Sequence, residues 1–254
     1  MDRIPTLQDV LLVLQTIAIV GLIARLLLAK LHKVYPFFFS YLVLVLLQSA
    51  VLAPVPYNSL FYRYAWVASE ILIVCLQALI VLEMYSAVLR DLGGFANLAR
   101  RYIKVTLGIA VVISLLLLGL EKTPKGPVGV TFIFERVVVL ALVILVLLIT
   151  VFLVYYPVPL NKNVIVYSIG FTIYLLTKAA ARLVQNARWR WYGEINTLLV
   201  VVPTACLVYW MLALNQSGER KTVVIGHRWK REDEDRLLSQ LKEINASLLR
   251  AARK

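Results

Sequence analysis

Seven apolar stretches divide this chain, each close to the roughly 20 residues that an α-helix needs to cross a bilayer. They cover approximately residues 10–29, 37–55, 64–89, 103–120, 136–156, 164–184 and 195–214. The composition agrees, because 61% of the residues are hydrophobic and only 16% are charged, whereas a soluble domain is about half apolar and a quarter charged. We therefore predict an all-α membrane protein in which residues 1–215 form a seven-transmembrane-helix bundle.

A polar tail, residues 216–254, follows the seventh span. It contains a short β-prone run, Thr222–Ile225, and then a stretch at about 232–252 in which Leu237, Leu241, Ile244 and Leu248 recur at helical spacing. We predict a C-terminal cytoplasmic amphipathic helix there. It is expected to lie on the membrane or under the bundle, or to dock a cytosolic or membrane protein partner.

The orientation rests on the tail, because the short loops carry similar numbers of Lys and Arg on both sides. Five basic residues follow the seventh span closely: Arg220, Lys221, Arg228, Lys230 and Arg231. We predict an integral protein of the plasma or inner membrane with the N-terminus outside and the C-terminus cytoplasmic. The formal net charge of +13 then reflects topology and contact with anionic lipid, and no nucleic acid partner is expected.

Motifs that carry catalysis or bind cofactors are missing from the sequence. Both histidines, His32 and His227, lie outside the predicted spans, and no zinc-protease, phosphate-loop, Gly-x-Ser-x-Gly or Cys-x-x-Cys pattern occurs. Cys75 and Cys206 fall inside apolar spans and are predicted to be packed thiols. A retinal Schiff base is not expected, because the seventh span has no lysine and Lys178, on the sixth, lies too near the surface. We expect a non-enzymatic protein with no metal site and no cofactor.

Ionisable residues inside the spans are the main functional signal, because a charge in hydrocarbon must pair, face the bundle interior or extend to the interface. Arg25 and Glu83 lie near predicted inner ends and are expected to extend to the interface. Glu70 lies deeper in the third span, with Trp66 at i−4 and Gln77 at i+7 on the same helix face.

The sixth span presents one polar and aromatic face in an otherwise apolar helix. Lys178 and Arg182 are four residues apart, and Tyr174, Phe171 and Tyr167 continue the same stripe. Under the predicted orientation, Glu70, Lys178 and Arg182 all lie in the outer third of the membrane. The candidate ligand-binding residues are therefore Glu70, Gln77, Trp66, Tyr174, Lys178 and Arg182.

Two interpretations of this cluster stay open. Glu70 is expected to pair with Lys178 or Arg182, and such pairs can simply neutralise each other and fix the helix register. Alternatively, the cluster lines an outward-facing cavity. Glu135 and Arg136, with residues at the ends of the sixth and seventh spans, are expected to frame it, and bases then outnumber acids. That excess of positive charge favours a small anionic or amphiphilic ligand.

A receptor or sensor that signals through the tail is the leading functional prediction. An alternative functional prediction comes from similar sequences at the starts of two spans. The third span opens with YRYAWVASEI and the seventh with RWRWYGEI. An arrangement of the first three and the last three spans as parallel repeats around the fourth resembles sugar transporters of the SWEET type, although no Pro-Gln motif is present. This arrangement implies a small-solute transporter. A structural subunit of a larger membrane complex is the third alternative.

Overall fold

The computed structural model describes residues 7–56, 58–89, 126–155, 158–187 and 192–225, with isolated positions within 105–113 and 236–250. The α-helices are α1 (Leu7–Leu28), α2 (Pro36–Leu52), α3 (Leu60–Val88), α5 (Pro127–Tyr155), α6 (Lys162–Ala187) and α7 (Tyr192–Ala213). Two 3-10 turns, η1 (Leu31–Lys33) and η3 (Gln216–Glu219), and two strands, β1 (Val158–Asn161) and β2 (Thr222–Ile225), complete the described elements. The all-α prediction is confirmed, apart from this small sheet.

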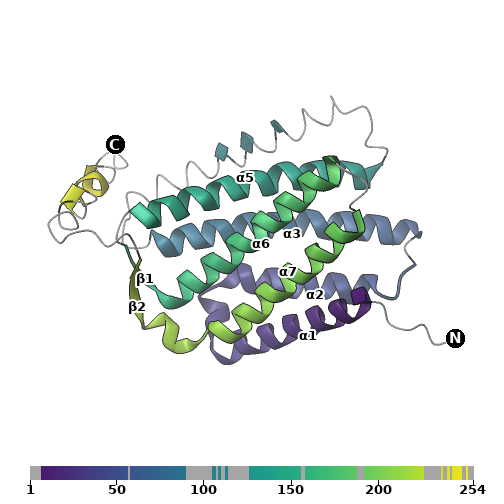
Figure 1. The fold of residues 1–254 in the computed structure, drawn as a ribbon, viewed down its shortest axis with the longest axis horizontal. Coiled ribbons are helices and arrows are strands. Elements are labelled where there is room, and N and C mark those ends of the chain that lie inside the picture. The colour runs from purple at the N-terminus through teal and green to yellow at the C-terminus, as the bar shows by residue number, and fades with distance from the viewer. Residues whose placement is uncertain are drawn as a thin grey trace.

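The helices run up and down and form a ring (Figure 1). Each described helix packs against its neighbours in the chain, and α7 returns to pack against α1 and close the ring. The ends of α1, α3, α5 and α7 and the starts of α2 and α6 lie near the strands, which we call the sheet end. The other end, where α6 finishes and α7 begins, is the far end.

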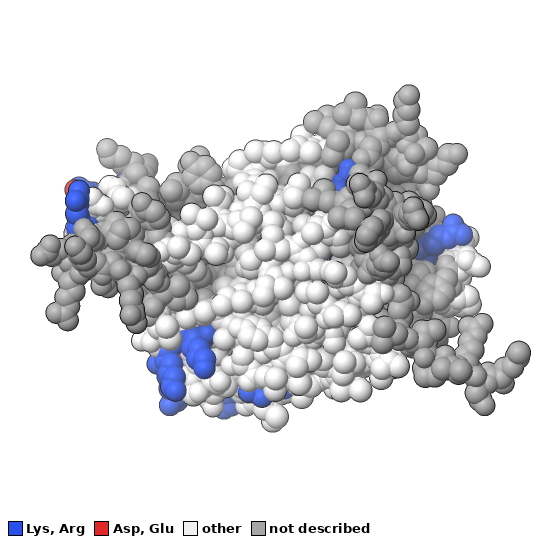
Figure 2. Space-filling view, viewed as in Figure 1, with Lys and Arg blue, Asp and Glu red and all other residues white. Residues whose placement is uncertain are grey.

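Four of the described helices contain segments long and apolar enough to cross a membrane: Val10–Leu28, Leu60–Val88, Pro127–Val154 and Lys162–Ala181. Two further apolar helices, Pro36–Leu52 and Thr197–Ala213, are shorter. Large apolar side chains on α1 and α5, such as Ile17 and Leu148, point outward and are about 60% exposed. In Figure 2, Lys and Arg lie mostly toward the two ends of the visible face, with a broad uncharged surface between them.

Helix boundaries follow local signals in the sequence. Pro36 occupies the first turn of α2, where its missing N–H costs no hydrogen bond. The Ser59 hydroxyl caps α3 by accepting a hydrogen bond from the backbone N–H of Tyr62 at 3.0 Å. The largest difference from the prediction is in α5, which begins at Pro127 and not at Arg136.

Two predicted elements lie outside the described residues for the most part. They are the fourth span, 103–120, and the amphipathic tail helix, 232–252.

The beginning of the tail is fixed to the bundle through a two-stranded antiparallel sheet. β2 pairs with β1, which joins α5 to α6, in the register Val158↔Ile225 to Asn161↔Thr222. The backbone N–H of Lys162 also donates to the carbonyl oxygen of Lys221 at 2.9 Å. The sequence indicated the β-prone run but not its partner, because Pro159 makes β1 look unlike a strand.

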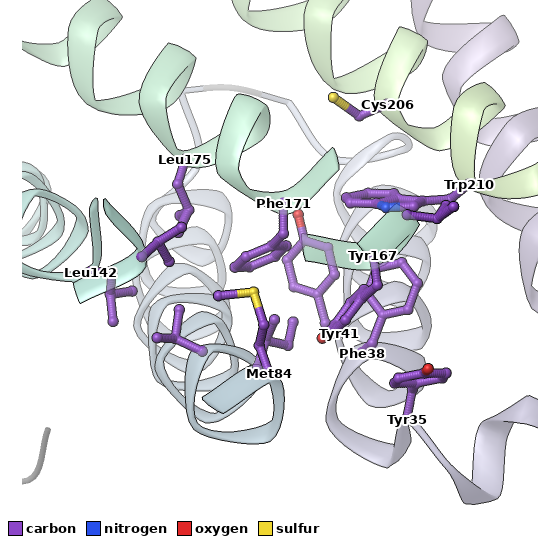
Figure 3. Packing of buried hydrophobic residues seen from close by; sticks show 14 of the residues in the cluster. Tyr35, Phe38, Tyr41, Met84, Leu142, Tyr167, Phe171, Leu175, Cys206 and Trp210 are labelled. Carbon is purple, nitrogen blue, oxygen red and sulfur yellow. The ribbon is translucent and has the colours of Figure 1, made fainter. Parts of the chain in front are cut away.

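Aromatic and aliphatic side chains fill the centre of the ring. Phe38, Tyr167, Phe171 and Trp210 are almost completely buried, and Figure 3 shows their rings clustered between α2, α6 and α7. The ring centroids of Phe38 and Trp210 are 4.9 Å apart in an edge-to-face arrangement that aromatic pairs favour. This core separates the far end of the bundle from the sheet end.

Candidate functional site

Three helices bring one ammonium group and two carboxylates together inside the bundle. Lys178 Nζ on α6 lies 3.3 Å from Glu70 Oε1 on α3 and 2.8 Å from Glu135 Oε1 on α5. All three residues are buried, and Glu135 has no exposed surface. The predicted pairing of Glu70 with Lys178 is therefore present, and Glu135 is the closer partner.

Glu135 was placed at the end of a span by the sequence, and the structure corrects this position. Because α5 begins at Pro127, Glu135 lies about 12 Å along the helix axis from its first residue. The predicted span began at Arg136, within the charged pair Glu135–Arg136, whereas the proline about two turns earlier is the stronger signal for a helix start.

Electrostatics in a low-dielectric interior explain why two acids contact one base. An isolated buried ammonium is strongly unfavourable, and ion pairs offset part of the desolvation cost only when the contacts are close. Lys178 is thus already engaged by Glu70 and Glu135. The predicted excess of bases around the opening depended on Arg182, Arg188 and Arg190, whose side chains lie outside the described residues.

Hydrogen-bonded hydroxyl and amide groups lie around Tyr174, one helical turn before Lys178 on α6. The Tyr174 hydroxyl accepts hydrogen bonds from the Tyr41 hydroxyl and from Gln77 Nε2, each at 2.9 Å. Gln77 is completely buried, and its Oε1 has no hydrogen-bond partner within the described part of the chain. An unsatisfied buried acceptor costs about 1–3 kcal/mol, so it calls for an explanation.

A cavity of about 220 Å³ lies beside the Lys178–Glu70 pair and is lined by residues of α1, α2, α3, α6 and α7. It is called the far cavity below. Its polar and aromatic lining residues are Gln15, Tyr41, Gln48, Glu70, Tyr174, Lys178 and Trp210, and the rest of its wall is aliphatic side chains and Pro203. A volume of this size holds roughly seven water molecules. It is smaller than the roughly 300–1,000 Å³ that encloses drug-sized ligands.

The structure places the six predicted site residues differently with respect to the far cavity. Glu70, Tyr174 and Lys178 line the far cavity, and Gln77 lies behind Tyr174. Trp66 is half-buried and packs against Phe132 with ring centroids 5.4 Å apart, away from the cavity lining. The side chain of Arg182 lies outside the described residues.

Several lining residues were missed by the sequence interpretation. Gln15 and Gln48 were visible as polar residues inside apolar spans, and this signal could have placed them. Gln48 Nε2 also donates to the Ser69 hydroxyl at 2.9 Å, which joins α2 to α3. Tyr41 and Trp210 carried no such signal, because aromatic residues are common in apolar helices.

Arg25 and Glu83, which were predicted to extend to the interface, both bind the ends of neighbouring helices at the sheet end. Arg25 Nε donates to the carbonyl oxygen of Leu214 at 2.8 Å, beyond the end of α7. Glu83 accepts from the backbone N–H of Phe37 at 3.0 Å and from the Tyr167 hydroxyl at 3.1 Å. Each charge therefore compensates the end of a neighbouring helix, which suits the helix dipole.

Glu219 is the centre of a second polar cluster, at the sheet end. Its carboxylate accepts hydrogen bonds from the Tyr35 hydroxyl at 2.6 Å and from the amides of Asn161 and Asn163 at 3.1 Å. Burial and the hydrogen bond to Glu219 raise the pKa of Tyr35 well above its usual range, so Tyr35 stays a donor. The tail is thus tied to the starts of α2 and α6 by side chains and by the sheet.

The two cysteines differ in environment. Cys206 on α7 is buried, as predicted, but Cys75 on α3 is exposed on the outside of the bundle. The prediction that Cys75 is a packed thiol is wrong, because its position on α3 faces away from the neighbouring helices. Among the described residues, no group of His, Cys, Asp and Glu side chains could hold a metal ion.

Comparisons of the chain with protein-family models, with curated proteins and with solved structures gave no match.

Proposed function

We propose that this chain is a non-enzymatic integral membrane protein that binds a small polar molecule in the far cavity and responds to it through its tail. The observation that carries the proposal is the far cavity itself, a space with a partly polar wall that includes the buried Lys178–Glu70 ion pair. Ionisable residues that face a cavity inside a membrane helix bundle are typical of ligand and ion sites.

Seven membrane spans are part of this proposal. Four helices meet the length and composition of membrane spans, and α2 and α7 supply two shorter apolar helices between them. α3 ends at the sheet end and α5 begins at the far end, and this alternation supports the fourth span predicted at 103–120. With the basic tail in the cytoplasm, the sheet end is cytoplasmic and the far cavity lies in the outer half of the membrane.

The contacts of Lys178 bear on the charge of the ligand. The anionic ligand favoured by the sequence depended on free positive charge, whereas Lys178 contacts two carboxylates. The other polar side chains on the wall are those of Gln15, Tyr41, Gln48, Tyr174 and Trp210, and all of them are uncharged. These groups favour a small neutral molecule that forms several hydrogen bonds.

A response through the tail is supported by the connections of α6. The same helix carries Lys178 and Tyr174 at the far cavity and, near its start, Asn163, which donates to Glu219. Aromatic rings on α6 fill the interval, because Tyr174, Phe171 and Tyr167 pack in sequence with centroids about 6 Å apart. A shift of α6 on ligand binding would therefore reach the tail.

The test measures thermal unfolding of the detergent-purified protein against small polyols, amides, amines and carboxylates at millimolar concentrations. A solute at about ten times its Kd should stabilise the protein by roughly 1.4 kcal/mol, or about 3 °C. Val45→Phe, which fills the far cavity, should abolish the shift. Leu47→Phe, on the exposed face of the same helix, should preserve it. If no solute acts, or if Val45→Phe keeps the full shift, the proposal fails and a purely structural subunit is favoured.

A further inference from the structure

A second cavity lies at the sheet end, along the same helices as the far cavity. It has a volume of about 710 Å³, and we call it the sheet cavity. Its polar lining residues are Lys33, Tyr35, Glu83, Ser86, Asn161 and Glu219. Both cavities therefore offer carboxylate and tyrosine hydroxyl groups, at opposite ends of one bundle.

Helices α3 and α6 line both cavities, and α2 lines the far cavity while the residue just before it lines the sheet cavity. In each case a fully buried residue lies between the two contributions. On α2, Phe38 lies between Tyr35, just before the helix and in the sheet cavity, and Tyr41 in the far cavity. The interval on this helix is short, since six residues correspond to about 9 Å of helical rise.

The other two helices repeat the pattern over ten residues, or about 15 Å. On α6, Phe171 lies between Val164 in the sheet cavity and Tyr174 in the far cavity. On α3, Gln77 lies between Ile73 in the far cavity and Glu83 in the sheet cavity. We call Phe38, Gln77 and Phe171 the central layer.

The central layer is apolar and closed except for one group. Trp210 packs on both rings, with centroids 4.9 Å from Phe38 and 6.4 Å from Phe171 (Figure 3). Gln77 is the polar member, and its buried Oε1 has no partner in the described part of the chain; the buried Nε1 of the adjacent Trp210 has none there either. A polar solute that passes between the two cavities would donate a hydrogen bond to Gln77 Oε1. This explains why the buried oxygen has no protein partner among the described residues.

We propose that the two cavities are the entrances of one path through the bundle, closed here at the central layer, and that a small neutral polar solute crosses by way of Gln77. This inference rests on the proposed function, because the ligand site in the far cavity is the first binding site along the path. A neutral solute is specified because no charged side chain belongs to the central layer, and an ion would be uncompensated between its rings.

Glycerol uptake into proteoliposomes that contain the full chain tests the path, with osmotic swelling as the readout. Glycerol fits a volume of 220 Å³, whereas sucrose, a disaccharide with nearly four times as many non-hydrogen atoms, does not. We expect glycerol uptake at least tenfold above that of protein-free liposomes and no such increase for sucrose. Gln77→Leu should lower the glycerol rate at least fivefold, and Phe171→Ala should raise it.

A matched pair of variants controls for general leakiness. Val45→Phe, in the far cavity, should block uptake, whereas Leu47→Phe, on the outer surface of α2, should leave it unchanged. Uptake at the protein-free level, or uptake indifferent to both Gln77→Leu and Val45→Phe, would overturn the path.

Cysteine labelling separates failure of the path from failure of the ligand site. In a Cys75→Ser/Cys206→Ser background, a charged thiol reagent should label Ile73→Cys only from the far side and Ser86→Cys only from the sheet side. Leu72→Cys, exposed on the outside of α3, is the lipid-facing control. Labelling of Ile73→Cys without glycerol uptake refutes the path alone. If Ile73→Cys is unreactive from both sides, the far cavity is closed and the proposed function fails as well.

Discussion

The ammonium of Lys178 lies 2.8 Å from the carboxylate of Glu135, and this contact joins α6 to α5 within a bundle whose surface is mainly apolar. Glu70 completes the group from α3 at 3.3 Å. The arrangement assigns different positions to the two acids, because Glu70 lines the far cavity and Glu135 is completely enclosed. Several measurable consequences follow from this group and from the polar cluster at the sheet end.

Lys178→Met should destabilise the protein by roughly 3–5 kcal/mol, because it leaves two buried carboxylates without the ammonium that both contact. Adding Glu70→Gln to that variant should recover at least about 1 kcal/mol by removing the charge of a buried carboxylate that has lost its contact with Lys178. Thermal unfolding in detergent measures both changes. Lys162→Met, at the exposed start of the same helix, is the matched control and should stay near the wild-type value. A double variant no more stable than Lys178→Met would contradict the charge balance described here.

Tyr174→Phe should cost more stability than Tyr41→Phe. The Tyr174 hydroxyl accepts from Tyr41 and from Gln77, so its removal leaves two buried donors without an acceptor, at roughly 1–3 kcal/mol. Tyr41→Phe removes a single hydrogen bond, worth about 0.5–1.5 kcal/mol. The comparison uses the same unfolding measurement, and the reverse order of stabilities would show that these hydrogen bonds are not centred on Tyr174.

Gly170→Ala should destabilise the bundle, although alanine normally favours a helix interior by about 1 kcal/mol. A Cβ at this position would lie 2.4 Å from Trp210 Nε1 and 2.7 Å from its Cε2, so either the buried Trp210 ring must move or α6 and α7 must separate. Overpacking of this kind costs about 1–3 kcal/mol. Gly21→Ala is the control, since its Cβ would meet only the flexible Met211 side chain at 3.0 Å. Equal stability of the two variants would mean that Trp210 can move aside.

Glu219→Ala should release the beginning of the tail. The change removes the acceptor for Tyr35, Asn161 and Asn163, and hydrogen bonds to a charged group are each worth about 1.5–3 kcal/mol. Amide hydrogen exchange in β2 should become at least tenfold faster, which corresponds to about 1.4 kcal/mol. Ser217→Ala, which changes an exposed hydroxyl two residues earlier, should leave the exchange rates of β2 unchanged.

Stability should fall at alkaline pH in a way that depends on Tyr35. Its pKa is raised in the folded protein by burial and by Glu219, so the unfolded chain loses this proton first as pH rises. The contribution is complete below about pH 10, the usual tyrosine pKa, and is lost progressively above it. Tyr35→Phe should reduce the slope of unfolding free energy against pH above pH 10. An unchanged slope would exclude Tyr35 as its source.

Much of the fold could be predicted from hydropathy alone. The described helices α1, α2, α3, α6 and α7 match predicted spans within a few residues at most ends, because a long apolar stretch leaves a chain few alternatives to a helix. The exception at the start of α5 displaced Glu135 from the predicted site. The pairing of β1 with β2 could not be predicted from the sequence either, because Pro159 weakens the strand signal of β1 and the two strands are far apart in the chain.

The sequence by itself determined which residues must find polar partners. A charge at Glu70 or Lys178 inside an apolar helix has to be compensated, and helical spacing determines which residues share its face. Only the tertiary structure decided which partners these are. Glu135, Tyr41 and Gln48 reach the site from other helices, and Arg25 and Glu83 bind helix ends. Periodicity describes one helix at a time, whereas distances between helices depend on how side chains pack around the whole ring.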